Sequence, residues 1–459
     1  MDRFRSERFL KMTIGRRQLM LAGLGVGLAA VAGPRVAVAR EEQPGGAFST
    51  YGAVPAGGEV DQTATLQSAA NMAAQSGRPL FLPAGIYSVG RIELKSGTQI
   101  QGVPGRTILR YRSGDAILSI TQGENVGLNG LVLDGANQPL GDGGALLIAV
   151  DAKHLNVTDC RFLASTGDGV VLRRVAGRIS ECEIAGSRNG GIFSEDAAGL
   201  EIADNHVHDC GNNGIQIWRS EPAEDGTIVT ANRIENIGAE SGGSGQNGNG
   251  VNVFRAGSVL VSANRITDCA FTAIRANSSA NCQMIGNSCA RFGEVALYAE
   301  FTFEGVIIAN NLVDKAAMGV SVTNFKQGGR LAVVQGNLIR NLFLRKDVDS
   351  RGVGIAVEAD SVVSNNVIEG APAYGILIGW GSYLRDVTVT DNLIRNAHIG
   401  IGVSADSRTG PTLITDNLIT GSKEGAIRAM NGATPIGPDL ARANAETYRN
   451  IAAFSNITG

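Results

Sequence analysis

The stretch Thr415–Ile419 reads Thr-Asp-Asn-Leu-Ile, and Thr390–Ile394 repeats the same five residues 25 positions earlier. The Asn of this motif recurs upstream in steps of 23 to 32 residues, and two earlier copies carry Cys160 and Cys182 in its place. The motif Asn stands at positions 205, 232, 264, 287, 311, 337, 366, 392 and 417. A period of this length predicts a solenoid of stacked coils, of which about eleven are recognisable in the sequence.

A second element, Gly-Ile/Val-x-Ile/Val-x, follows each motif, as in Gly400-Ile401-Gly402-Val403. A third apolar stretch precedes each Asn, for example Val387-Thr388-Val389. Alternation of apolar residues with others indicates short strands, so each coil of about 24 residues carries three of them. The prediction is an all-β fold, a right-handed parallel β-helix. The Leu-x-x-Leu-x-Leu signature of leucine-rich repeats is absent.

The composition fits one repetitive body rather than the two or three domains that 459 residues suggest by length alone. Gly reaches 62 residues, aromatic residues make up only 5%, and the net charge is -3. We expect no nucleic-acid partner, because no basic patch stands out beyond the N-terminus. The sequence predicts no oligomeric state.

The N-terminal segment has the pattern of an export signal. Arg16 and Arg17 precede an apolar run from Leu19 to Ala32, and Ala37-Val38-Ala39 supplies a small-x-small cleavage pattern. The paired arginines predict twin-arginine export, with residues 1–39 as a cleaved signal peptide. The general secretory route is the alternative. We therefore expect a periplasmic or secreted protein with no stable membrane span after cleavage.

Both ends of the body carry predicted caps. Asp61 to Gly77 has the apolar spacing of one amphipathic helix, with Leu66, Ala69 and Ala73 on one face. Such a helix would close the open end of the solenoid. The predicted organisation is therefore a cap segment with a short helix in 40–78, the β-helix in 79–430, and a C-terminal cap or tail in 431–459.

Three stretches support a family resemblance: Tyr51-Gly52-Ala53, Asp61-Gln62-Thr63 and Leu82–Tyr87. They resemble the opening of the pectate-lyase superfamily, and the signal with its repeats resembles twin-arginine-exported bacterial repeat proteins of uncharacterised function. The resemblance implies a β-helix and a carbohydrate partner, either a polysaccharide or a cell-envelope glycan. The superfamily contains lyases, C5-epimerases, hydrolases, tailspikes and non-catalytic proteins. No catalytic signature of its enzymes occurs here, so no catalytic role is carried over.

Alternation in the second strand of each coil assigns side chains to the inside or the outside. The outward residues of the middle coils form a candidate carbohydrate-binding face of amides, charges and aromatic rings. These residues are Gln216, Trp218, Asn252, Phe254, Arg275, Asn277, Tyr298 and Glu300. Long loops at 219–227, 238–249 and 343–351 flank this face and are expected to form the walls of a groove.

Two functions fit this face. A lyase or epimerase acting on an acidic polysaccharide would use Arg275 to neutralise a uronate carboxylate or as the base, Tyr298 as acid or base, and Asn252 as a carboxylate ligand. The alternative is a non-catalytic binding or envelope-structural protein. No cofactor or metal site is predicted, and calcium has no clear carboxylate cluster. His206, His208 and Asp209 could form a metal or acid–base cluster, but they fall beside a turn, away from the face. Asp168 is expected to be a turn residue.

Overall fold

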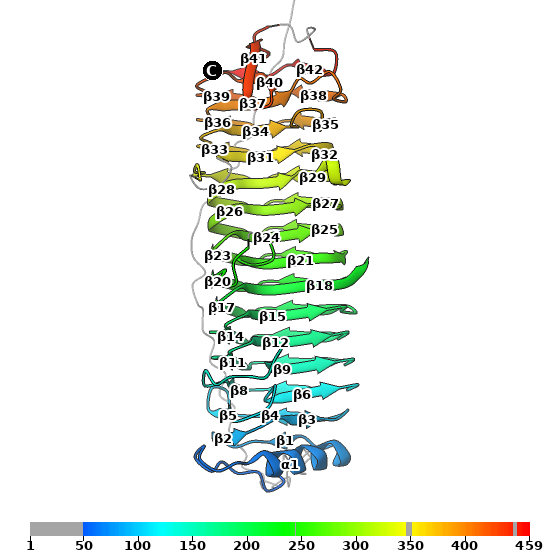
Figure 1. Cartoon of the computed structure of the whole chain (residues 1–459), viewed down its shortest axis with the longest axis vertical. Coiled ribbons are helices and arrows are strands. Elements are labelled where there is room, and N and C mark those ends of the chain that lie inside the picture. Colours follow the sequence, from blue (N-terminus) through cyan, green and yellow to red (C-terminus); the bar gives the residue numbers. More distant parts are fainter. Residues whose placement is uncertain (1–48, 244, 346–350, 444–447) are drawn as a thin grey trace, which may run out of the picture. The chain divides into compact units, whose positions relative to one another are not determined.

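The computed structural model describes residues 49–243, 245–345, 351–443 and 448–459, so the predicted signal segment 1–39 with Arg16 and Arg17 lies outside it. The described chain is a right-handed parallel β-helix with one short α-helix near its N-terminal end (Figure 1). This confirms the predicted fold. No described helix is long and apolar enough to cross a membrane.

One coil near the C-terminal end shows how the strands stack. It contains β35 (Arg385–Thr390), β36 (Leu393–Arg395) and β37 (Ile399–Ser404), which pair in parallel with β38 (Thr412–Thr415), β39 (Leu418–Thr420) and β40 (Ile427–Asn431). The pairing places Val389 over Ile414, Ile394 over Ile419 and Ile401 over Ile427. Columns of inward-facing apolar residues therefore form one continuous core.

Hydrogen bonding groups the strands into a sheet of 15 and a sheet of 28. The larger sheet covers two faces of the solenoid, because long strands continue around the bend between them. β26 (Ser288–Glu300), for example, pairs with both β23 (Arg265–Cys269) and β24 (Thr272–Asn277). The bend joins these two faces into one hydrogen-bonded surface, and β24 and the second half of β26 carry part of the predicted carbohydrate-binding face.

The repeated Asn residues form a buried ladder along one corner. The side-chain oxygen of Asn311 accepts hydrogen bonds from the backbone and side-chain nitrogens of Asn287, at 2.9 and 3.0 Å. Its own amide nitrogen donates to the Met284 carbonyl and to Asn337. The left-handed conformation of the turn belongs to the residue before the ladder Asn, such as Asn310 at φ 58°. The sharp bend and the buried hydrogen bonds therefore fall on adjacent residues.

The N-terminal end is closed by α1 (Thr63–Ser76), slightly shorter than the predicted helix (Figure 1). Leu66, Ala69, Ala70 and Ala73 are buried, as the spacing predicted. The Asp61 carboxylate accepts a hydrogen bond from the Thr63 backbone nitrogen at 2.9 Å, just before the helix begins.

The parallel stacking continues past residue 430 and into the expected tail. β41 (Thr434–Asp439) folds back antiparallel on β40, and then β42 (Ile451–Phe454) and β43 (Ile457–Thr458) pair in parallel with β38 and β39. Asn456 adds a further rung to the ladder by accepting from Asn417. The sequence repeat did not reveal Asn456, because the connection that precedes it is much longer than in the other coils.

The solenoid also has coils that the repeat did not reveal, since its smaller sheet contains 15 strands. The earliest of these are β1 (Leu80–Phe81), β4 (Gln99–Gln101) and β7 (Gly127–Asn129). Their corners lack the Asn motif, and Gly130, at φ 66°, provides the left-handed turn after β7. A glycine corner leaves no periodic polar residue for a sequence search to detect.

Candidate functional site

The predicted outward face forms with the expected register on β18 (Asn213–Glu224), β21 (Asn249–Gly257), β24 and β26. One outward column runs Gln216, Asn252, Arg275, Tyr298, and the second runs Trp218, Phe254, Asn277, Glu300. The structure thus brings all eight predicted residues together on one sheet face.

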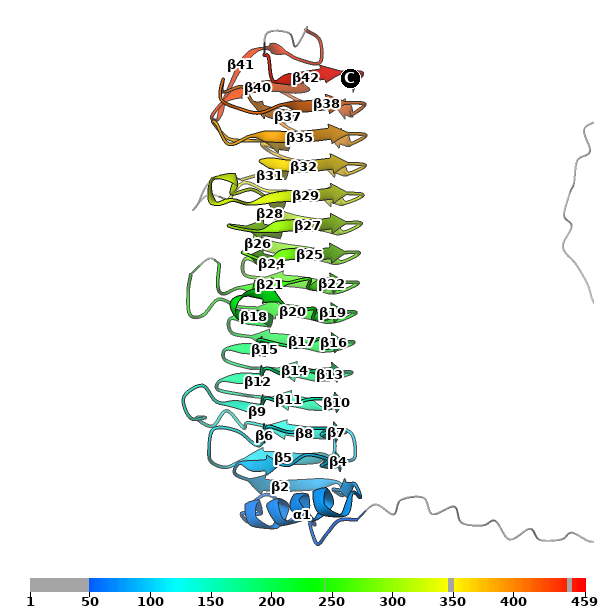
Figure 2. The same ribbon diagram turned by 90° about the vertical axis from the view of Figure 1, so that its right-hand side faces the viewer.

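The loop 238–249, of which residue 244 is not described, projects from the solenoid beside β18 and β21 (Figure 2). Its residues contact the first column, which is largely shielded from solvent, instead of only forming a wall beside it. Gln216, Asn252 and Arg275 are only 7%, 3% and 6% exposed. The Asn252 amide donates to the carbonyls of Gly245 and Gln246, both at 3.3 Å. Asn252 therefore holds the loop down, which is a different role from the carboxylate ligand expected of it.

Arg275 is held by a partner from the next coil. Its Nε and Nη2 donate to the two carboxylate oxygens of Glu300, each at 2.6 Å, and Asn277 donates to the same carboxylate at 2.7 Å. The guanidinium also lies 4.9 Å from the centre of the Tyr298 ring. Glu300 therefore already neutralises the positive charge of Arg275, which was expected to neutralise a uronate carboxylate.

Tyr298 is half-buried beside this pair. Burial, with a smaller contribution from the nearby Glu300 charge, raises the pKa of Tyr298 to about 12. Its hydroxyl is therefore protonated at neutral pH. In this protonated state the phenol can donate a proton or a hydrogen bond, and the raised pKa disfavours its use as a base.

A second buried ion pair lies behind the first and was not predicted. Arg351 contacts the Glu294 carboxylate at 3.0 Å, and the other oxygen of Glu294 lies 3.9 Å from Nη1 of Arg275. Neither that oxygen nor Arg275 Nη1 has a hydrogen-bond partner within the described ranges. Glu294 is 6% exposed, so the two pairs form one buried, charge-balanced network under the loops.

Beside the covered column, the second column opens into a cavity of about 390 Å³, here called the aromatic pocket. The Trp218 ring centre lies 5.4 Å from that of Phe254 and 5.5 Å from that of Phe193 in the preceding coil. Phe301, which is 42% exposed, lies at the other end. The lining comprises Trp218, Gly245, Gln246, Asn252, Phe254, Arg275, Asn277, Glu300 and Phe301.

Six of these lining residues were predicted from alternation alone. Gly245 and Gln246 were missed because they belong to the covering loop, and Phe301 because it follows the end of its strand. Of the predicted residues, Gln216 and Tyr298 do not line the pocket.

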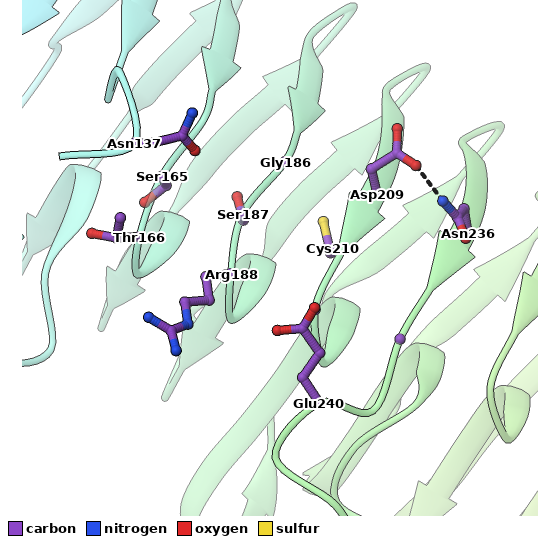
Figure 3. Close-up of a pocket in the computed structure, with 12 residues that line it drawn as sticks. Asn137, Ser165, Thr166, Gly186, Ser187, Arg188, Asp209, Cys210, Asn236 and Glu240 are labelled. Carbon is purple, nitrogen blue, oxygen red and sulfur yellow. Dashed lines mark hydrogen bonds between the residues drawn. The ribbon is translucent and has the colours of Figure 1, made fainter. Parts of the chain in front are cut away.

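A second hollow of about 430 Å³ lies at the bend before these strands (Figure 3). Arg188 and Glu240 extend into it, and Asp209 is hydrogen-bonded to Asn236 at its edge (Figure 3). No aromatic ring lines this hollow. Its polar, open surface has fewer features of a specific ligand site than the aromatic pocket.

The histidine cluster is held by neighbouring carboxylates. His206 contacts Glu235 at 2.7 Å, and His208 contacts Asp209 at 2.6 Å. The hydrogen bond from His208 is the main cause that lowers the pKa of Asp209. Within the residues placed by the structure, no three His, Cys, Asp or Glu side chains form a group suited to a metal ion.

Asp168 lies at the start of β12 (Asp168–Arg173) and accepts hydrogen bonds from the Gly190 backbone nitrogen at 2.7 Å and from Asn189 at 2.8 Å. Burial raises its pKa despite these contacts. The two hydrogen bonds tie adjacent coils together from the first residue of a strand, so Asp168 is a strand residue and not the turn residue that was expected.

Solved structures similar to this chain share its fold. Gene product 12 of bacteriophage phi29 matches with a TM-score of 0.50 and 17% identity. The match covers 89% of this chain but only 55% of the phage protein. The catalytic unit of a GH87 α-1,3-glucanase from Streptomyces thermodiastaticus matches with a TM-score of 0.50 and 15% identity, over 91% of this chain and 69% of that one. A search of curated protein sequences gives no match.

The family model for a right-handed β-helix region matches residues 143–240 and 222–385, which together make up more than half of the chain. The matched residues include the coils of the Asn ladder as far as the start of β35, and they include every residue that lines the aromatic pocket. The chain therefore belongs to the right-handed β-helix family.

Proposed function

We propose that this protein binds a polysaccharide chain in the aromatic pocket. The observation that carries the proposal is the combination of exposed ring surface from Trp218, Phe254 and Phe301 with amide groups from Gln246 and Asn277 in one cavity. Aromatic rings suit the apolar faces of pyranoses, and amides exchange hydrogen bonds with hydroxyl groups. The same fold carries the α-1,3-glucanase named above.

The arrangement suits an extended ligand along the solenoid axis. Phe193, Trp218 and Phe254 stand on three consecutive coils, which are spaced at about 4.8 Å, the distance between neighbouring strands. Trp218 and Phe254 are stacked in the second column and Phe193 precedes them in the first, so an extended sugar chain would contact the rings of successive coils.

Binding is better supported than proton abstraction. A lyase or epimerase needs a base, an acid and a group that neutralises the uronate carboxylate. Arg275 is already neutralised by Glu300, and Tyr298 is protonated at neutral pH. The lyase or epimerase remains the second candidate, since a bound sugar would lie beside Arg275, whose guanidinium contacts the Tyr298 ring.

We further propose that the protein is exported and works on a glycan outside the cytoplasm. Arg16 and Arg17, with the apolar run and cleavage pattern behind them, support this location. Replacing both by Lys should block twin-arginine export. Normal processing of that variant would point to the general secretory route.

The two tryptophans of the chain permit a matched test of the binding site. Trp218→Ala should weaken oligosaccharide binding by roughly tenfold or more, because a central aromatic anchor contributes about 2 kcal/mol. Trp380, which is 47% exposed and outside the pocket, is the control, and Trp380→Ala should leave affinity unchanged. Isothermal titration calorimetry with a panel of hexasaccharides measures both. Equal affinity of the Trp218 variant and the parent protein would contradict the proposal.

A further inference from the structure

Among the described residues that line the aromatic pocket, two carry charged side chains, Arg275 and Glu300. Both nitrogens on one edge of the guanidinium meet both oxygens of the carboxylate at 2.6 Å. The glutamate side chain is 3% exposed and the arginine side chain 7%. The lining therefore presents a closed ion pair without net charge.

A further carboxylate stands behind this pair. The Glu294 oxygen at 3.9 Å from Arg275 Nη1 faces the one guanidinium nitrogen that Glu300 leaves free. A carboxylate on a ligand that approached Arg275 would be repelled by Glu300 in the lining and by Glu294 behind it. It would also lose its hydration next to a cation that is already balanced, which makes its burial unfavourable.

Two hydrogen-bond donors of residues that line the pocket are buried and unsatisfied within the described chain. Trp218 Nε1 and Arg275 Nη1 are buried atoms of lining residues, and neither has a hydrogen-bond partner in the part of the chain that the structure covers. A buried donor without a partner is costly unless a ligand or water satisfies it. Hydroxyl and ring oxygens of a sugar are acceptors that satisfy such donors without bringing a charge.

From this charge balance we infer that the glycan bound in the aromatic pocket is a neutral, hydroxyl-rich polysaccharide and not a polyuronate. The inference rests on the proposed function and names its substrate class. It replaces the acidic ligand that a free Arg275 would have favoured.

One cation at the margin needs its own control. Arg255 has its guanidinium 4.8 Å from the centre of the Phe254 ring and donates to the Ser220 carbonyl at 2.8 Å, and it does not line the pocket. Affinity for acidic chains that originates at this margin of the pocket would depend on this residue. Arg255→Gln therefore separates margin effects from pocket effects.

The first test compares neutral with acidic hexasaccharides by calorimetry on the mature protein. The probes are cellohexaose, xylohexaose and laminarihexaose against hexagalacturonate and hexamannuronate. The neutral class should contain the tightest ligand, by about tenfold or more. Its affinity should change less than about twofold between about 50 and about 500 mM NaCl, because salt screens only charged contacts.

A uronate as the tightest ligand, retained in Arg255→Gln and lost with salt, would overturn the inference while leaving the proposed function intact. Binding of no hexasaccharide from either class would contradict the proposed function as well.

The second test reverses the selectivity. Glu300→Gln removes the partner that neutralises Arg275, so the variant should gain affinity for hexagalacturonate by about tenfold, and that gain should disappear at high salt. Glu369→Gln is the matched control, because Glu369 pairs with Arg395 at 3.7 Å on a distant coil and loses the same charge. A gain in the control equal to that in Glu300→Gln, or no gain in a folded Glu300→Gln protein, would count against the role assigned to the ion pair.

Discussion

Asn311 shows how one side chain joins three successive coils. Its carbonyl oxygen accepts two hydrogen bonds from Asn287, and its amide donates to the Met284 carbonyl and to Asn337. The side chain is 2% exposed, so water cannot replace these partners. The Asn repeat in the sequence therefore reflects a network of buried hydrogen bonds, which apolar core residues cannot form.

We expect Asn311→Ala to lower the free energy of unfolding by roughly 2–5 kcal/mol, because each buried group left without a partner costs about 1–3 kcal/mol. Urea unfolding followed by circular dichroism measures the change. Gln283→Ala is the control, since Gln283 is exposed on β25 (Ala280–Ile285) and should stay within about 0.5 kcal/mol of the parent. Equal midpoints for both variants would argue against an energetic role for the ladder.

The cysteines offer a second prediction for single residues. All six are free and buried, including Cys160 and Cys182, which occupy the ladder position in adjacent coils. Burial raises the pKa of Cys210, Cys282 and Cys289 to about 12, and the reactive thiolate is therefore scarce at pH 8. A thiol reagent such as DTNB should label almost no cysteine in the folded protein and all of them in denaturant. Rapid labelling of native protein, or a Cys160–Cys182 peptide in mass spectrometry, would contradict this.

For single residues of the site, the sequence correctly predicted which side chains point outward, but it did not predict the ion pairs that they form. Alternation correctly placed Arg275 and Tyr298 in one outward column. Alternation does not specify rotamers, so the turn of Glu300 back toward Arg275 was not foreseeable. Glu294 was missed for a different reason: the register of β26 against β28 (Leu312–Val322) shifts between Phe292 and Val295, where a strict period of two no longer applies.

At the scale of a strand, two adjacent isoleucines test the assignment of inside and outside. Ile308 and Ile307 are neighbours on β27 (Glu304–Ala309), but Ile308 is 0% exposed and Ile307 is 38% exposed. Ile308→Asp buries an unpaired charge, which should cost several kcal/mol and lower the yield of soluble protein. Ile307→Asp should remain within about 1 kcal/mol of the parent in thermal unfolding. Similar losses for the two variants would mean that the faces are misassigned.

Loops were the elements that the sequence described least well. The predicted loop 219–227 is largely strand, because β18 continues to Glu224, and residues 346–350 of the predicted loop 343–351 lie outside the described residues. The loop 238–249 is present, but its path over the first column depends on amide contacts that a local sequence pattern does not specify. Asn213 donates to the Gln246 carbonyl at 2.8 Å, and Asn252 donates to Gly245 and Gln246. Gly245 lies so close to Arg275 that an added Cβ would come within 3.2 Å of the guanidinium. Such contacts between distant positions leave no periodic trace in the sequence.

At the scale of the whole molecule, the strand pairings of each coil run to the coils directly before and after it. Stability in such a solenoid is approximately a sum over coils and their interfaces. This modularity explains why a repeat alone predicted the architecture, while the total number of coils depended on corners that lack the motif. It also allows the aromatic pocket, on β18 to β26, to function apart from coils farther along the stack.

Removing one whole coil tests this modularity. Deleting 393–417 takes out β36, β37 and β38, and it places Leu418 directly after Asn392, where Leu393 stood in the same register. The shortened protein should fold, with a solenoid about 4.8 Å shorter by small-angle X-ray scattering, because every remaining strand meets an equivalent neighbour. Its melting temperature should fall modestly, since one inter-coil interface is lost.

Oligosaccharide binding by this variant should match that of the parent, since the pocket ends at Phe301. Deleting 393–404 instead removes only β36 and β37 and brings a strand of the smaller sheet to a corner of the larger one. That variant should be insoluble or unfolded, because its inward and outward residues no longer match those of the adjacent coils. If the half-coil deletion folded as well as the full-coil deletion, or if the full-coil deletion abolished binding, coil-by-coil independence would be the wrong description of this molecule.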